Sequence, residues 1–69
     1  MMSGTFVLVD EFPECDICAA SGKEVPAAYD AKTFEGPWAY LCVSHWNTDA
    51  KYQWLGTGAG QELRLKSSE

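Results

Sequence analysis

Three cysteines and one histidine constrain the fold of this chain more than any other feature. Two residues separate Cys15 from Cys18, two separate Cys42 from His45, and 23 residues lie between the pairs. A two-residue gap lets both side chains of a pair reach one ion, and a long gap lets a hairpin bring the second pair back. Thiolates favour zinc over harder ions. The spacing therefore predicts one structural Zn²⁺ held by all four residues.

Other interpretations of the same residues are weaker. A Cys15–Cys18 disulfide with a redox role would be expected within a βαβ pattern, and none surrounds it. A rubredoxin-like iron site would need a sulfur where His45 supplies a nitrogen. For the second pair alone, Cys42 could be an inert buried thiol beside a surface His45. That interpretation loses force because all three cysteines and the sole histidine fit one site.

The length of the chain makes a structural metal physically useful. With 69 residues, the sequence is expected to form a single zinc-binding domain over residues 1–69. A domain near 60 residues buries only about 60% of the surface that its unfolded chain exposes. Such small domains commonly need a metal, disulfides or a partner subunit. No targeting segment is evident, and the apolar run FVLV is too short to span a membrane. These features predict a cytoplasmic protein, where cysteines are more often metal ligands than disulfides.

The remaining sequence predicts short elements around the metal. We expect a zinc-stabilised α+β fold, a treble-clef-like finger made of a zinc knuckle, a β-hairpin and a short helix. In chain order the expected elements are a strand at 4–10, a hairpin at about 25–41, a helix at about 43–53 and a strand at 61–66. The first and last strands are expected to pair with each other or with a second subunit. The alternative is a zinc β-ribbon, with a second knuckle and no substantial helix after Cys42.

The predicted helix and the segment after it rest on two local patterns. Val43, Trp46, Ala50 and Trp54 are spaced by three, four and four residues, which places them on one helical face. The alternative is a later helix start, capped by Asn47 or Thr48. The glycine-rich segment 56–60 is expected to end the helix and form a mobile link. It matches neither a phosphate-binding loop nor a dinucleotide-binding loop, because its glycines are wrongly spaced and no lysine follows.

The chemistry of the chain argues against an enzyme. A catalytic zinc site keeps one position open for water, whereas four protein ligands close the shell here. The only histidine is a predicted ligand, so none is left to act as a general base. A zinc deaminase would need a His-x-Glu motif upstream of Pro-Cys-x-x-Cys, and the chain has no upstream histidine.

Charge and aromatic content indicate which partners to expect. The net charge is −5 and the basic residues are spread out, which argues against duplex nucleic acid. Most aromatic side chains are expected to pack in the core, with one or two serving as anchors for a protein partner. Candidate contacts with a basic partner are the acidic residues after the first strand. The predicted partner-binding residues are Trp38, Trp54, Asp10 and Glu11, and residues 5–9 are a candidate dimer contact.

The segments CDIC, GPWAYLCVSHW and LGTGAGQ together resemble a group of small zinc-finger proteins encoded by phages and prophages. Their pattern is Cys-x-x-Cys, then Gly-Pro-Trp-Ala-x-(Leu/Met)-Cys-x-x-(His/Cys), then Leu-Gly-x-Gly-x-Gly-Gln. The resemblance covers about residues 13–61 and implies the same four metal ligands. Members of the group usually carry a basic residue where this chain has Ala59. The resemblance also implies a phage factor, which would act in the host cytoplasm.

Two functions are therefore expected from the sequence. The first is a zinc-stapled protein-interaction module, favoured by the negative charge, the number of aromatic residues and the lack of catalytic groups. The alternative is a zinc finger that binds single-stranded nucleic acid by stacking bases on Trp and Tyr side chains.

Overall fold

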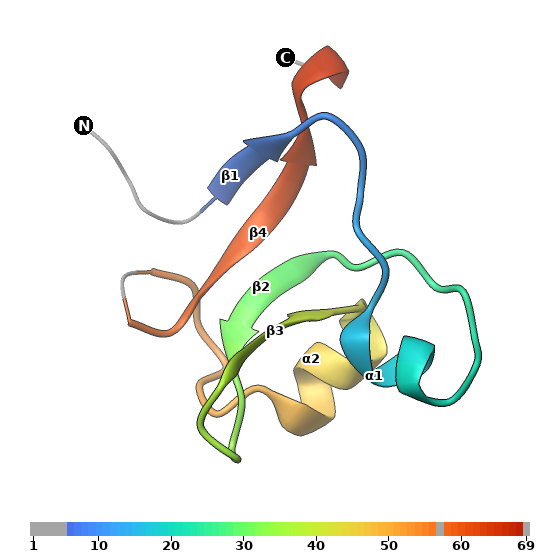
Figure 1. Ribbon diagram of the computed structural model, residues 1–69. Helices are drawn as coiled ribbons and strands as arrows, with labels where there is room; N and C mark the ends of the chain where they lie inside the picture. The colour runs from blue at the N-terminus through green and yellow to red at the C-terminus, as the bar shows by residue number, and fades with distance from the viewer. Residues whose placement is uncertain (1–5, 57, 69) are drawn as a thin grey trace.

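The computed structural model describes residues 6–56 and 58–68, and shows a small α+β fold (Figure 1). Within those residues the strands form one sheet in the order β1-β4-β2-β3. The strands are β1 (Phe6–Val9), β2 (Tyr29–Lys32), β3 (Trp38–Leu41) and β4 (Gly60–Leu65). The helices are α1 (Asp16–Ala20), α2 (Val43–Asp49) and the 3₁₀ turn η1 (Lys66–Ser68). Positions 4 and 5 of the predicted first strand and dimer segment, and position 57 of the glycine segment, lie outside the described residues.

The predicted hairpin is present as β2 and β3. The two strands pair in antiparallel fashion, with Tyr29 opposite Leu41 and Lys32 opposite Trp38. Its turn is closed by Thr33, whose hydroxyl donates a hydrogen bond to the carbonyl oxygen of Pro37 at 2.8 Å. The hairpin returns the chain to the first cysteine pair, as the long gap in the cysteine pattern requires.

The first and last strands pair with each other, which was one of the two expected arrangements. β1 runs parallel to β4, with Phe6 opposite Glu62 and Val9 opposite Leu65. β4 also pairs with β2, but only over Gly60 to Glu62. Beyond Leu63, β4 and its partner β1 therefore extend past β2 and β3 as a two-stranded ribbon (Figure 1).

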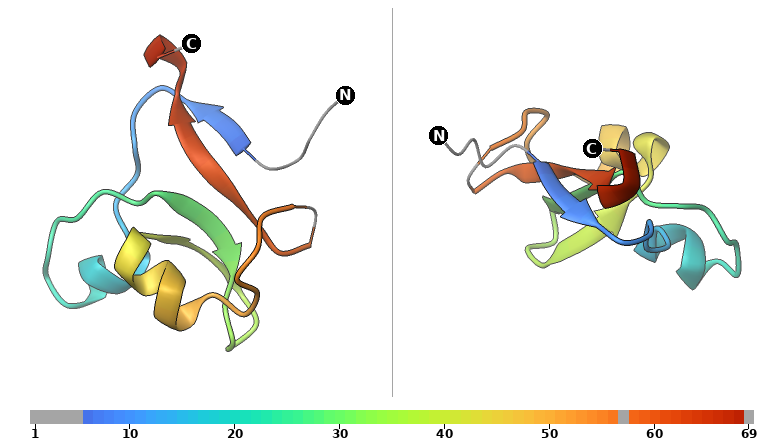
Figure 2. Two further views of the ribbon diagram at one scale, coloured as in Figure 1. Left: turned by 180° about the vertical axis from the view of Figure 1, so that it is seen from behind. Right: turned by 90° about the horizontal axis from the view of Figure 1, so that it is seen from above.

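This ribbon is less covered than its apolar sequence suggests. Phe6, Val7 and Leu8 keep 36–39% of their surface exposed. α2 lies over β2 and β3 on one face of the sheet, α1 lies near β3, and neither helix reaches β1 (Figures 1 and 2). Among the described residues β1 is therefore not buried within the chain, although its apolar sequence would suit a strand covered on both faces. The predicted dimer contact through residues 5–9 stays a prediction.

α2 begins directly after Cys42, as predicted, but ends at Asp49 rather than near residue 53. The next segment pairs with the end of β2 instead of continuing the helix. Ala50 is fully buried in an extended conformation and forms a bridge with Thr33. The N–H of Lys51 then donates to the carbonyl oxygen of Lys32 at 2.8 Å. Trp54 consequently lies outside the helix and not on its apolar face. The presence of α2 also argues against the zinc β-ribbon alternative, which has no substantial helix at this point.

The interior is built mainly from small side chains. One cluster contains the three cysteines, and a second contains Ala31, Leu41 and Ala50, with Trp46 packed against it. Trp46 also stacks on Tyr29, with ring centroids 4.7 Å apart. The expectation that most aromatic side chains form the core is wrong. Large exposed aromatic side chains are Phe6, Phe12, Phe34, Trp38, Tyr40, Tyr52 and Trp54.

The glycine-rich segment is a hydrogen-bonded turn rather than the mobile link that was expected, as far as its described residues show. The N–H of Gly56 donates to the carbonyl oxygen of Gly60 at 2.8 Å, and the N–H of Gly60 donates to the carbonyl oxygen of Gly56 at 3.1 Å. Ala59 is fully buried, and its carbonyl oxygen accepts a hydrogen bond from the N–H of Lys32. The segment thus connects α2 to β4 and sets where β4 begins.

Gly60 lies too close to β2 to accept an added methyl group without a shift of the backbone. A Cβ there would lie 2.9 Å from the Cβ of Ala31 and 3.3 Å from the carbonyl oxygen of Asp30. We expect Gly60→Ala to destabilise the zinc-loaded protein by about 1–3 kcal/mol, because β4 must move away from β2. In thermal unfolding, each kcal/mol corresponds to roughly 4–8 °C in a domain of this size. Gln61→Ala is the matched control, since it adds no atom; an unchanged midpoint for Gly60→Ala would contradict the close approach.

Candidate metal centre

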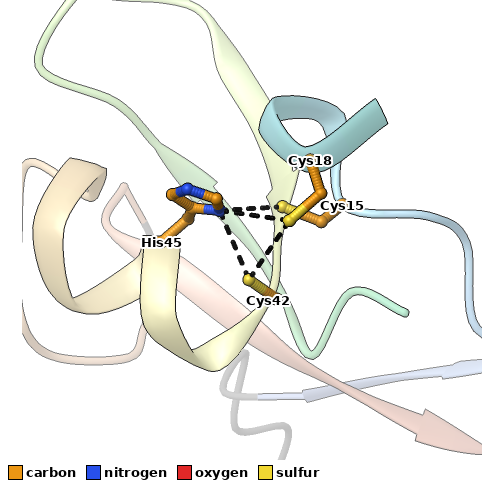
Figure 3. Close-up of side chains that lie close together, drawn as sticks. All are labelled: Cys15, Cys18, Cys42 and His45. Carbon is orange, nitrogen blue, oxygen red and sulfur yellow. Dashed lines mark hydrogen bonds between the residues drawn. The ribbon is translucent and has the colours of Figure 1, made fainter. Parts of the chain in front are cut away.

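The first cysteine pair is held by a short antiparallel contact and by α1. The N–H of Cys15 donates to the oxygen of Val25 at 2.8 Å, and the N–H of Ala27 donates to the oxygen of Pro13 at 2.7 Å. Cys15 is the N-cap residue of α1, and Cys18 lies within this five-residue helix. The carbonyl oxygen of Cys18 accepts a hydrogen bond from the N–H of Lys23 at 2.9 Å. These contacts fold the Cys-x-x-Cys segment so that both thiols point to the same side (Figure 3).

The second pair is positioned by the start of α2. Cys42 is the N-cap residue, and its carbonyl oxygen accepts a hydrogen bond from the N–H of Trp46 at 2.8 Å. His45 lies three residues beyond Cys42, in the first turn of the helix. Residues three apart lie on the same side of a helix, so His45 projects toward the thiol of Cys42. The chain therefore needs only the end of β3 and one helical turn to supply two ligands.

The four predicted ligands converge on one point. Their ligand atoms all lie within 4.8 Å of one another. The Nδ1 atom of His45 is 3.5 Å from the sulfur of Cys15 and 3.4 Å from each of the other two sulfurs. The sulfurs of Cys18 and Cys42 are 3.9 Å apart. Tetrahedral zinc bonds of about 2.3 Å to sulfur and 2.0–2.1 Å to nitrogen would give separations of about 3.8 Å and 3.6 Å. The cluster thus has the dimensions of a tetrahedral metal site.

The imidazole of His45 adopts the orientation that such a site requires. Nδ1 faces the three sulfurs, whereas the other ring nitrogen points away from them (Figure 3). The tautomer with its proton on Nε2 leaves the Nδ1 lone pair free for a metal ion. All three cysteines are at most 7% exposed, and His45 is half-buried.

The electrostatics of the cluster also favour a cation at its centre. Burial raises the pKa of the Cys18 thiol, and hydrogen bonding and charge repulsion from Cys15 and Cys42 raise it further, to about 11. Burial acts in the same direction on Cys15. Hydrogen bonds from the backbone at Cys18 and Cys42, and from the side chains of His45 and Cys18, outweigh it and lower the pKa of Cys15 to about 6. Three thiolates this close cannot all stay ionised alone, and a divalent ion would neutralise the repulsion.

Cys15, Cys18 and Cys42 are free thiols in this structure and are not joined in a disulfide. The donor set instead fits one metal ion with three sulfur ligands and one nitrogen ligand. Comparison of the chain with family models, with curated proteins and with solved structures gives no match. Among the described residues, no helix is long and apolar enough to cross a membrane.

The other predicted site residues do not form a single patch. Trp38 begins β3 and is 45% exposed, and Trp54 lies in the segment after α2 and is 54% exposed. Asp10 and Glu11 follow β1, at the opposite end of the molecule from the turn that precedes Trp38 (Figure 1). Asp10 forms an exposed ion pair with Lys66, with 3.5 Å between the charged atoms. The structure therefore leaves these four residues exposed but divides them between separate surfaces.

Asp16 has a structural role that the sequence reasoning did not single out. Its carboxylate accepts a hydrogen bond from the N–H of Tyr40 at 2.8 Å. β3 is an edge strand of the sheet, so this contact links the α1 segment to that edge and satisfies one of its outward N–H groups. The only available signal was its position between the first two ligands, which does not identify its partner.

Asp16 also affects a neighbouring carboxylate. Burial raises the pKa of Asp30, and the negative charge of Asp16 adds to the effect. A raised pKa in the folded state means that ionised Asp30 lowers stability, and that this penalty fades as the pH falls through its folded-state pKa. We expect Asp30→Asn to stabilise the zinc-loaded protein at pH 7 by up to about 0.5 kcal/mol. Urea unfolding at several pH values measures this change in the free energy of unfolding. A stabilisation by Asp30→Asn that increased toward lower pH would contradict the raised pKa of Asp30.

Proposed function

We propose that this chain is a zinc-stapled protein-interaction module with a treble-clef-like arrangement of its ligands. The first ligand pair precedes the β2–β3 hairpin, and the second pair lies where the hairpin leads into α2. The observation that carries the functional proposal is the reversal of the usual residue distribution. Alanine and cysteine dominate the interior, whereas large apolar side chains remain on the surface. A fold held by a metal can leave its aromatic residues free for a partner.

Several features support zinc as the metal and a structural role for it. Soft thiolates and one imidazole nitrogen are the usual ligands of structural zinc. The four buried or half-buried residues could supply all four ligands of a tetrahedral ion, which would leave no position for water or substrate. We further propose that the protein is not an enzyme and that it acts in a reducing compartment such as the cytoplasm. A role as a phage factor is part of the same proposal.

The most promising contact surface is the β1–β4 ribbon. Strands that pair in parallel are usually apolar and covered on both faces in all-parallel sheets. β1 has the same apolar character, although it forms the one parallel pairing among the described strands of this mixed sheet. Here Phe6, Val7 and Leu8 are partly exposed on the edge strand, and no described helix covers them. Exposed apolar surface on a small domain is typical of interaction sites. We propose that a partner protein covers this ribbon, and that a second copy of the chain is the alternative cover.

The experiment is a quantitative pull-down from host-cell lysate with tagged, zinc-loaded protein. It compares the wild type with Leu8→Lys. We expect one protein to be recovered in stoichiometric amount, and a charge on the ribbon to abolish its recovery. Val43→Lys is the matched control, because Val43 is also exposed but lies on α2, away from the ribbon. Sedimentation analysis of the purified protein measures whether it is a monomer or a dimer, and so distinguishes a partner protein from a second copy of the chain. Equal recovery with both variants would show that the ribbon is not the contact surface.

Binding of single-stranded nucleic acid is the second candidate. The supporting observation is an exposed cluster in which the Lys51 ammonium lies 5.6 Å from the ring of Tyr52, which contacts Trp54 with 5.9 Å between ring centroids. Two C-terminal basic residues are less available, because Arg64 pairs with Glu62 and Lys66 pairs with Asp10. Oligonucleotide binding that weakens steeply with salt and is lost in Trp54→Ala would favour this function over the first.

A further inference from the structure

A small cavity outside the metal centre has the chemistry of a side-chain binding site. Its volume is about 140 Å³, and three segments contribute to it. Its lining residues are Ile17 from α1, Thr33, Phe34 and Glu35 from the turn after β2, and Asp49 from the end of α2. None of the four metal ligands lines it. Ligand sites for drug-sized molecules are typically about 300–1,000 Å³, so this cavity suits one side chain better than a whole cofactor.

The walls of the cavity are held in place by backbone contacts. The N–H of Phe34 donates to the carbonyl oxygen of Asp49 at 3.2 Å, and Thr33 forms a bridge with Ala50. The hydroxyl of Thr33 is used within its own turn, where it donates to Pro37. Ile17 packs against both buried clusters. The cavity is therefore largely formed before any ligand binds, which reduces the entropic cost of binding.

The charged residues that line the cavity have one sign. Glu35 and Asp49 are acidic, and no basic residue is among the residues that line it. Asp49 is the last residue of α2, where the backbone carbonyl groups add negative potential. The hydroxyl of Thr48 donates to the Asp49 carboxylate at 3.1 Å and orients it. The chain as a whole carries a net charge of −5, which reinforces attraction of a cation.

The apolar part of the lining adds a second requirement. Ile17 provides an aliphatic surface, and Phe34 is 69% exposed, so its ring is open to a ligand. A cation can lie over an aromatic ring, and the stems of lysine and arginine pack on apolar surface while their charged ends reach polar groups. The cavity thus combines an apolar wall for a stem with two carboxylates for a charged end.

We infer that this cavity receives one basic side chain, arginine or lysine, from a partner protein. The inference rests on the proposed interaction function and adds the chemistry of a contact, at a surface separate from the β1–β4 ribbon. The acceptors are the carboxylates of Glu35 and Asp49, and Phe34 covers the stem or the charged group.

The test is a titration of zinc-loaded, ¹⁵N-labelled protein with the peptide acetyl-Gly-Arg-Gly-amide, followed by amide chemical shifts. The control peptide replaces arginine with citrulline, which has nearly the same shape but no charge. We expect saturable shifts at residues 17, 33–35 and 49 with the arginine peptide, and much smaller shifts with citrulline. Asp49→Asn and Phe34→Ala should each weaken binding roughly fivefold.

Glu24→Gln is the matched control variant, because it removes one negative charge at an exposed position that does not line the cavity. It should leave binding of the arginine peptide within twofold of the wild type. Equal binding of the citrulline peptide, or equal weakening by Glu24→Gln and Asp49→Asn, would overturn the inference. If pull-down of a partner succeeds while Asp49→Asn neither weakens that binding nor alters the peptide titration, the cavity assignment fails and the interaction function stands.

Discussion

Removal of the metal is expected to unfold this chain. Structural zinc sites contribute about 10–16 kcal/mol of apparent binding free energy at neutral pH. Whole domains are typically stable by only about 5–15 kcal/mol. Here the buried side chains are mostly alanine and cysteine, with Leu41 and Leu63 as the larger members, so the apolar core alone supplies little stability. The metal-free chain should therefore lose its fixed tertiary structure.

The measurement is a titration with a strong zinc chelator, followed by far-ultraviolet circular dichroism and by amide chemical-shift dispersion. We expect both signals to collapse together and to return when one equivalent of zinc is added. Acid should have the same effect, because protons compete with zinc for the thiolates. A folded spectrum after complete removal of zinc would contradict the proposed structural role.

Substitutions at His45 are expected to separate ligation from packing. His45→Ala removes one of four ligands and should weaken zinc binding by more than the 10–100-fold typical of changes at groups that only support a ligand. His45→Cys replaces the nitrogen with a thiolate and should retain one tightly bound ion, because Cys₄ and Cys₃His sites are both common structural zinc sites. Competition with a chromogenic chelator measures both affinities.

A neighbouring position supplies the control for this pair. Ser44 precedes His45 in the same helical turn and is exposed, so Ser44→Ala should leave zinc affinity unchanged. If His45→Ala binds zinc as tightly as the wild type, the histidine is not a ligand. If His45→Cys loses the ion, the site depends on the imidazole geometry in a way that the four-ligand scheme does not explain.

The ligand set could be predicted from the sequence because its determinants are local. Two short gaps bring each pair together within one turn of backbone, and the hairpin between them needs only a turn at residues 35–37. The start of α2 was predictable for the same reason, since its apolar spacing begins directly after Cys42. Pairing of the first and last strands was one of two possibilities, and the sequence contained nothing that selected between them.

The features that the sequence did not reveal depend on tertiary contacts. Ala50 continues the helical spacing, yet the bridge to Thr33 draws it into the sheet and ends α2. The glycine segment has a flexible composition, but the hydrogen bonds between Gly56 and Gly60 and the burial of Ala59 fold it into a turn. Exposure of Trp38 and Trp54 was not predictable either, because spacing alone does not show which faces other elements cover.

The cavity beside the metal centre illustrates the same limit. Ile17, Phe34 and Asp49 are far apart in the sequence, and no spacing links them. They meet where α1, the turn after β2 and the end of α2 come together, and the proposed metal ion would hold α1 and α2 against the hairpin, so the site and the proposed contact depend on one fold. Substitutions that empty the metal centre should therefore also abolish binding of a basic peptide.

The central claim is that Cys15, Cys18, Cys42 and His45 bind one zinc ion in a closed shell. Zinc K-edge X-ray absorption on the purified protein, combined with metal analysis, tests it most directly. We predict one zinc per chain, with three sulfur neighbours at about 2.3 Å, one nitrogen neighbour at about 2.0–2.1 Å and no water ligand. A protein that carries no zinc after expression in zinc-supplemented medium, or a first shell that contains a water oxygen, would contradict it.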